Sequence, residues 1–350
     1  MVTIEPQLQE CCSDSCVKQL TNDYFRSRVV GDVALLHRQL DAGQLSADLR
    51  QLQRQAPFRS TLYLLLSWGG FWLAWWLLVN LPSWAGVLAL VLAGISIRAI
   101  GVLLHDFSHR NGFRRQSLNE WVGQWLLAVP LAGSMARYRT QHMQHHANLG
   151  DPVRDPDYVN LPAVEAGAFR GLRSYASAVF RRSNFANSLL DGWWPLSAPG
   201  VWRAHLWWLG LTLAAVGLAG PHDGLAVPLL WFTARASSYH LIKVFTELSD
   251  HAGLPPGGVL HYTRNMPGNW VRHLINPYGD NYHLVHHLAP TVPLARLAQA
   301  HRLFLQSPAY ARISNPQSYF LGSDSILKSW SRLAPYPHSC PVSKIEIPET

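Results

Sequence analysis

The sequence predicts an all-α integral membrane protein with four transmembrane helices, paired as two hairpins, and a cytoplasmic helical domain that carries a metal site. The 350-residue chain contains four apolar segments of about the length that crosses a bilayer. Only 14% of its residues are charged, against roughly 25% in soluble domains. Its 17 histidines include three clusters with helical spacing. Length, low charge and histidine spacing together indicate this fold.

The first 59 residues are predicted to form a cytoplasmic N-terminal segment. Within it, residues 21–59 have the pattern of an amphipathic helix, in which Val29, Val33 and Leu36 lie opposite arginines. Such a helix can lie on the membrane surface, cover the cytoplasmic domain, or be an ordinary solvated helix. The sequence leaves these three alternatives open.

Four apolar runs predict the two membrane hairpins. The first hairpin pairs residues 61–81 with residues 84–104, and the second pairs residues 201–220 with residues 225–245. Neither short turn contains lysine or arginine, so the positive-inside rule places the turns outside. Both termini and the long segments after each hairpin are then on the cytoplasmic side of the inner membrane.

Residues 118–135 are apolar but are interrupted by Pro130. A fifth span here would place the histidine clusters on opposite sides of the bilayer. We therefore expect a re-entrant or interfacial segment.

The three histidine clusters are one HxxxH and two HxxHH motifs. At this histidine frequency an HxxHH is expected about 0.04 times by chance, and two are present. Residues at i, i+3 and i+4 share a helical face, so each cluster points its rings at one place. With one more histidine at the end of the fourth span, nine candidate metal ligands result. They are His105, His109, His142, His145, His146, His251, His283, His286 and His287.

Nine imidazoles are more than one metal ion uses. A zinc site takes four ligands and would leave five unexplained, whereas two iron ions fit the count better. Glu247 shares a helical face with His251 and is predicted to reach between the two ions; an ion pair with a nearby arginine is its alternative. Asp106 and Asp280 adjoin ligand histidines and are predicted to accept their free ring N–H groups, unless they are simply exposed.

The third cluster has a characteristic context, Gly279-Asp280-Asn281-Tyr282-His283-Leu284-Val285-His286-His287-Leu288, followed by Pro290 and Pro293. With the order of the three clusters between two membrane hairpins, it resembles the integral-membrane fatty acid desaturase superfamily of non-haem di-iron enzymes. The resemblance covers about residues 60–310, the expected di-iron domain, and leaves residues 311–350 as a cytoplasmic tail.

The resemblance implies that the nine histidines bind two Fe ions. It also implies O2 as co-substrate, electrons from a carrier protein, and oxidation of an unactivated C–H bond in a fatty acyl lipid or free fatty acid. Two features differ from the acyl-CoA type. The first cluster is HxxxH rather than HxxxxH, and Glu247 occupies a position that is similar to an amide in that type.

Desaturation is the expected reaction, and oxidative decarboxylation of free fatty acids to terminal alkenes or lipid hydroxylation are alternatives within the superfamily. A histidine-rich metal transporter is the alternative from another class, but transport predicts polar residues at the bilayer midplane, where these spans are apolar.

The expected partners follow from what the sequence contains and lacks. Cys11, Cys12, Cys16 and Cys340 do not form an iron–sulfur motif, so we expect a separate electron donor, a ferredoxin or similar protein, with its reductase. The net charge of +8 comes without a nucleic-acid-binding motif and suits an anionic bilayer surface.

Overall fold

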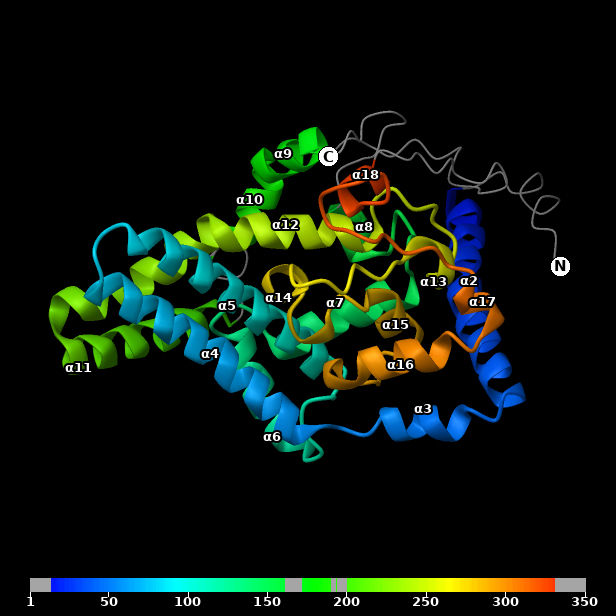
Figure 1. Ribbon diagram of the computed structural model, residues 1–350, viewed down its shortest axis with the longest axis horizontal. Helices are drawn as coiled ribbons and strands as arrows, with labels where there is room; N and C mark the ends of the chain where they lie inside the picture. Colours follow the sequence, from blue (N-terminus) through cyan, green and yellow to red (C-terminus); the bar gives the residue numbers. More distant parts are fainter. Residues whose placement is uncertain (1–13, 161–171, 190–192, 194–199, 331–350) are drawn as a thin grey trace.

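The computed structural model describes residues 14–160, 172–189, 193 and 200–330, and this part of the chain consists of helices and loops without a β-strand (Figure 1). The predicted all-α class is confirmed. Cys11, Cys12 and Cys340 lie outside the described residues. The shorter helices are α8 Pro156–Asn160, α9 Leu172–Phe180, α10 Arg182–Leu189, α13 Val259–Tyr262, α14 Arg272–Ile275, η2 Pro277–Gly279, η3 Leu294–Arg296, α16 Leu297–Phe304, α17 Pro308–Ala311 and α18 Ile326–Ser329.

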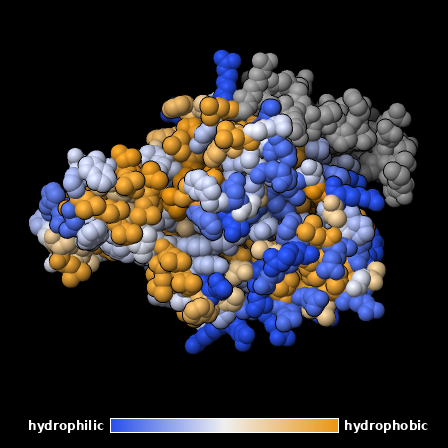
Figure 2. All heavy atoms as spheres, in the orientation of Figure 1, coloured by the Kyte–Doolittle hydropathy of each residue, from blue (hydrophilic) through white to orange (hydrophobic). Residues whose placement is uncertain are grey.

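Three helical stretches are long and apolar enough to cross a membrane. They are α4 Pro57–Asn80, α5 Ala85–Ser108 and the stretch Val201–His251, which comprises α11 Val201–Ala236 and α12 Ser238–His251. Their outer faces carry exposed large apolar side chains, among them Leu65, Leu88, Leu213 and Leu218. Figure 2 shows hydrophobic surface gathered over the end of the molecule where α4 and α11 lie. A surface of this kind is typical of contact with lipid.

The third stretch is interrupted at Gly220, whose φ of 84° is outside the helical region. The chain reverses its direction there. The evidence is that a Cβ on Gly224 would lie 2.7 Å from the carbonyl carbon of Ala215, which is nine residues earlier in the sequence. Trp75 of α4 donates its ring N–H to the carbonyl of Asp223 (2.9 Å) and ties the reversal to the first hairpin. The two arms of α11 are visible at the left of Figure 1.

Helix α5 lies at the centre of the helical assembly and packs against α4, α11 and α12. The closest approach is at Gly94, where an added Cβ would lie 2.7 Å from the backbone nitrogen of Tyr239. Ser238 donates its hydroxyl to the carbonyl of Leu90 at this crossing (2.6 Å). The absence of a side chain at Gly94 therefore allows α5 and α12 to run in direct contact.

The N-terminal segment is not the single helix that was predicted for residues 21–59. It forms α2 Asp14–Ala42 and α3 Ser46–Leu52, separated by a turn in which Gln44 has a φ of 58°. Helix α2 packs against α13, α15 and α17, which is the covering position among the three alternatives. Asp32 fixes it by accepting a hydrogen bond from the backbone N–H of Leu260 (3.0 Å).

The segment predicted to be re-entrant or interfacial is largely helical. Most of the predicted segment 118–135 lies in α6 Gln116–Val122 and the π-helix η1 Gly123–Ala128, which packs against α5. Their re-entrant or interfacial position stays a prediction.

In the segment expected as a tail, Tyr319, Ile326 and Trp330 are buried in a cluster with Phe245 and Leu248 of α12. Residues 319–330 thus belong to the folded body.

The crossing at Gly94 generates a stability prediction. Gly94→Ala should destabilise the protein by about 1–3 kcal/mol, because the new methyl group overlaps α12. Gly101→Ala on the same helix meets nothing within 4 Å and should be neutral or stabilising by up to about 1 kcal/mol. Thermal unfolding of the purified variants in one detergent measures both. Equal melting temperatures would contradict the close crossing.

Candidate metal centre

Four helical segments deliver the nine predicted histidines to one region. His105 lies in the last turn of α5, and His109 caps its C-terminus. Helix α7 Met135–Ala147 supplies three rings, the last residue of α12 supplies His251, and the short buried helix α15 His283–Leu288 supplies three. The structure thus brings together all nine histidines that the sequence singled out.

Five of these rings form the first of two groups, which we call the five-histidine group. It consists of His105, His109, His142, His146 and His286. One nitrogen from each ring lies within 4.8 Å of all the others. The Nε2 atom of His142 is 2.8 Å from that of His109, and the Nε2 atom of His146 is 3.0 Å from that of His286. Ligand nitrogens about 2.1 Å from an ion, as at zinc, lie up to about 4.2 Å apart, and the separations of 2.8 and 3.0 Å are within this limit. The group is therefore a candidate site for one metal ion.

The other four rings form the four-histidine group, which consists of His145, His251, His283 and His287. Its Nε2 atoms also converge: that of His283 lies 3.2 Å from that of His251 and 3.0 Å from that of His287. All four residues are buried. The nitrogen donors and their spacing fit a second metal ion.

The two groups are adjacent because single helices contribute to both. In α7, His142 and His146 belong to the five-histidine group and His145 to the other. In α15, His283 and His287 belong to the four-histidine group and His286 to the other. The rings of His146 and His287 stack with their centroids 4.2 Å apart, so the two sites lie side by side. The arrangement is suited to a pair of metal ions.

Burial keeps most of these rings in the form that binds metal. It lowers the pKa of His142, His146, His286 and His287 well below 6.5, so they are neutral at pH 7. Burial also lowers the pKa of His145, but the carboxylates of Asp157 and Asp155 outweigh it and raise that pKa to about 9. An ion that binds His145 therefore displaces a proton.

Hydrogen bonds behind two rings of the four-histidine group fix their orientation. The Nδ1 atom of His145 donates to Asp155 (2.7 Å), which also accepts from the backbone N–H of Gly150 (2.8 Å). The Nδ1 atom of His251 donates to the carbonyl of Tyr262 (2.8 Å). With Nδ1 carrying the proton, Nε2 is left as the ligand atom. Asp155 was not among the predicted residues, because a loop position has no periodicity that places it against a helix.

The two aspartates predicted to support ligand rings differ in what they do. Asp280 lies 3.9 Å from the Nδ1 atom of His105, and its carboxylate is held by Arg98 (2.5 Å) and Asn276 (3.3 Å). Asp106 contacts no ligand ring. It accepts hydrogen bonds from Asn111 (3.0 Å) and from the backbone of Leu294 (3.3 Å). The prediction for Asp106 is corrected accordingly: it joins α5 to the loop after α15.

The carboxylate of α12 that lies near an Nε2 atom of the four-histidine group is not the predicted one. Glu247 belongs to neither group; it is about half exposed and forms an ion pair with Lys243 (2.5 Å). The predicted bridging position of Glu247 is therefore corrected to this ion pair. By contrast, Asp250 has an oxygen 3.9 Å from the Nε2 atom of His283, and its side chain is 19% exposed. Helical spacing favoured the residue four before His251 and overlooked the one directly before it.

The sequence of this chain is similar to a known protein family and to two desaturases. The sequence profile described as Fatty acid desaturase matches residues 82–315, which contain all nine histidines. The dihydrorhizobitoxine desaturase of Bradyrhizobium elkanii is 26% identical over 252 residues, which cover 66% of this chain and 71% of that protein. The sn-1 oleoyl-lipid 12-desaturase of Arthrospira platensis is 23% identical over 296 residues, which cover 73% of this chain and 74% of that protein.

The division into two groups predicts the metal content of single variants. His286→Ala and His287→Ala remove one ligand from different groups, so each should lower the bound metal from two ions towards one per chain. His301→Ala is the matched control, since its ring bonds Tyr310 and belongs to neither group. Elemental analysis of purified protein measures the stoichiometry. Full metal content in both test variants would refute the assignment of ligands.

The hydrogen bond behind His145 predicts a smaller effect. Asp155→Asn should weaken metal binding about 10- to 100-fold, because the neutral amide no longer fixes and polarises the ring. Competition with a chelator measures the change. Asp48→Asn, in the first turn of α3, should have no effect.

Proposed function

Because the chain belongs to the fatty acid desaturase family, we propose that it is a membrane enzyme that uses O2 to desaturate a fatty acyl chain at two iron ions. The observation that carries this proposal is the pair of adjacent histidine groups, which hold five and four ring nitrogens. Imidazole alone does not select iron among the later transition metals. Membership of the family supports iron as the metal.

When bound, the two irons supply activation of O2 for C–H oxidation, and the chain's own residues bind and orient them. Nine neutral rings leave the positive charge of the ions uncompensated, and a buried charge is costly without partners. Asp155, Asp157, Asp250 and Asp280 surround the two groups and offset this charge. The apolar side chains of α15, Leu284, Val285 and Leu288, are buried and help keep water out.

We assign Asp250 as the carboxylate that faces the ion of the four-histidine group. Its oxygen lies 3.9 Å from a ligand nitrogen, a separation possible for two ligands of one ion with bonds of about 2.1 Å. Among the residues that the structure describes, no lysine or arginine forms an ion pair with it. A largely enclosed carboxylate without a paired cation is favoured when a metal ion provides the positive charge.

We further propose that α4, α5 and the two arms of the Val201–His251 stretch are four membrane spans. The reversal at Gly220 gives that stretch two antiparallel arms, and the sequence 217–224 contains no lysine or arginine. Helices α5 and α12 both end at the histidine groups, which supports a site on one side of the bilayer. The positive-inside rule makes that side cytoplasmic, within reach of a ferredoxin-type electron donor.

Desaturation is preferred over other oxidations because both relatives compared above are named as desaturases. Their named substrates differ from each other, so neither is transferred to this chain. A histidine-rich transporter is disfavoured because all nine rings are in helices or at a helix end of a packed site, and seven of the nine residues are buried.

The reaction can be tested with purified protein supplied with iron, a ferredoxin, its reductase, O2 and fatty acids or acyl lipids of several lengths. Mass spectrometry should detect a product two hydrogens lighter than the substrate, dependent on O2 and on the electron donor. A terminal alkene one carbon shorter would instead identify a decarboxylase, and a product one oxygen heavier a hydroxylase. Either result would overturn desaturation while keeping the di-iron site.

The two carboxylates of α12 give a matched pair of variants. Asp250→Asn should lower product formation at least about tenfold and reduce iron retention, because an amide provides no negative charge to the ion. Glu247→Gln breaks only the ion pair with Lys243 and should retain both irons. Iron content and the Mössbauer spectrum of iron-57-loaded protein distinguish the two variants. Loss of iron in Glu247→Gln alone would favour the carboxylate predicted from sequence.

A further inference from the structure

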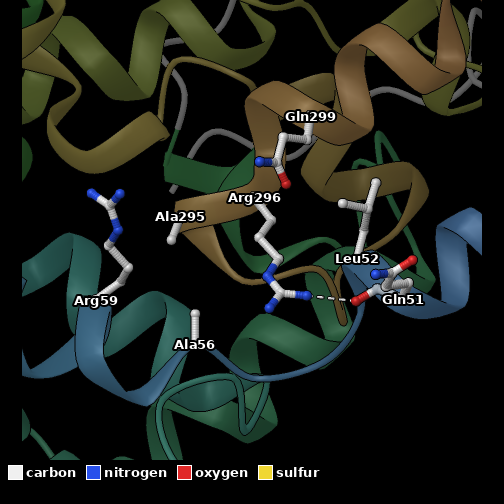
Figure 3. A pocket seen from close by; sticks show the side chains of 7 residues that line it. All are labelled: Gln51, Leu52, Ala56, Arg59, Ala295, Arg296 and Gln299. Carbon is white, nitrogen blue, oxygen red and sulfur yellow. Dashed lines mark hydrogen bonds between the residues drawn. The ribbon is translucent and has the colours of Figure 1, made fainter.

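A pocket of about 370 Å³ lies between the start of α4 and the segment formed by η3 and α16 (Figure 3). It is separate from the metal centre, since none of its lining residues is one of the nine histidines. The lining residues are Gln51, Leu52, Ala56, Arg59, Ala295, Arg296 and Gln299. Two segments that are far apart in the sequence, residues 51–59 and 295–299, therefore form one pocket.

The polar lining of this pocket is made of hydrogen-bond donors and cations. Arg59 and Arg296 provide two guanidinium groups, and Gln51 and Gln299 provide side-chain amides. No aspartate or glutamate lines the pocket, and no described carboxylate forms an ion pair with either arginine. Arg296 donates one N–H group to the carbonyl of Gln51 (2.5 Å), which leaves its other donors for a ligand. Two uncompensated guanidinium groups favour an anion.

The position of the pocket indicates which anion reaches it. Arg59 lies in the first turn of α4, a helix long and apolar enough to span a bilayer, so the pocket is at the membrane–water boundary. The first-turn backbone N–H groups of this helix add a partial positive charge. Beyond the pocket, Phe58 is 78% exposed and Leu65 is 65% exposed. An anionic head group at Arg59 can therefore have its acyl chains along the outer face of α4.

We propose that this pocket binds the phosphate of an anionic phospholipid, with Arg59 and Arg296 as its charged contacts. The lipid then joins the start of α4 to η3, beside the bonds from Arg296 to Gln51 and from Gln53 to Thr291 (3.0 Å) and the packing of α3 against α16. This is a binding site for a membrane lipid rather than for the acyl chain that is oxidised. The proposal of a lipid-binding site does not depend on the desaturase activity proposed above.

The test measures lipid binding by native mass spectrometry of full-length protein in detergent, titrated with phosphatidylglycerol or with zwitterionic phosphatidylcholine. Wild-type protein should bind phosphatidylglycerol more tightly. Arg59→Gln should weaken this binding about fivefold, as expected for one basic residue at a membrane surface, and Arg59→Gln with Arg296→Gln about 25-fold. Arg59→Gln leaves the contact between Arg296 and Gln51 in place, so it also controls for local unfolding.

Arg54→Gln is the matched control, because Arg54 is exposed on the same connecting segment but does not line the pocket. It should bind phosphatidylglycerol like the wild type. Equal binding of the two lipids, or unchanged binding in the double variant, would overturn the proposal. Displacement of phosphatidylglycerol by laurate or by inorganic phosphate at equal concentration would show that the pocket takes a fatty acid carboxylate or a free anion instead.

Discussion

The structure depends on the convergence of nine imidazole rings, seven of them on buried residues. In eight of these rings the Nε2 atom faces the Nε2 atom of another ring. Neutral rings placed this way bring lone pairs together at about 3 Å. Buried polar atoms are normally paired, and these nitrogens can all be satisfied at once only by cations between them. A metal ion bound between these rings would therefore couple metal binding to the folding of this region. The surrounding helices can be understood as the means of holding the rings in place.

The helical period explains how so few elements serve two ions. In HxxHH, the first and last histidines are four residues apart and point the same way, while the middle one is rotated by about 100° from the last. In each of α7 and α15, the outer two histidines belong to one group and the middle histidine belongs to the other. The outer pair of α7 belongs to the five-histidine group, whereas the outer pair of α15 belongs to the four-histidine group. Each helix therefore crosses the boundary between the sites. That exchange keeps the two histidine groups adjacent.

Elements with strong periodicity were predictable from sequence, and contacts made by loops were not. The long apolar helices and the nine ring positions follow from hydropathy and from i, i+3, i+4 spacing. Asp155 could not be predicted, because its loop has no repeating geometry. Asp250 could not be predicted from helical spacing, because that spacing selects residues on the same helical face as His251. Asp106 was assigned to a ring by adjacency in sequence, but its side chain points to Asn111 and Leu294. Proximity in sequence does not fix the direction of a side chain.

The membrane helices set the precision of the metal centre through one crossing. From the contact of Gly94 with Tyr239, α5 continues for about 17 Å to His105, and α12 for about 18 Å to His251, at 1.5 Å per residue. Both helices run from the crossing towards the site, so their relative register decides where these two ligands arrive. A slip of one residue would shift a ring by about 1.5 Å and rotate it by about 100°, which is incompatible with metal–nitrogen bonds of about 2.1 Å. Close packing at a glycine deep among the helices is therefore a requirement of the metal site at their ends.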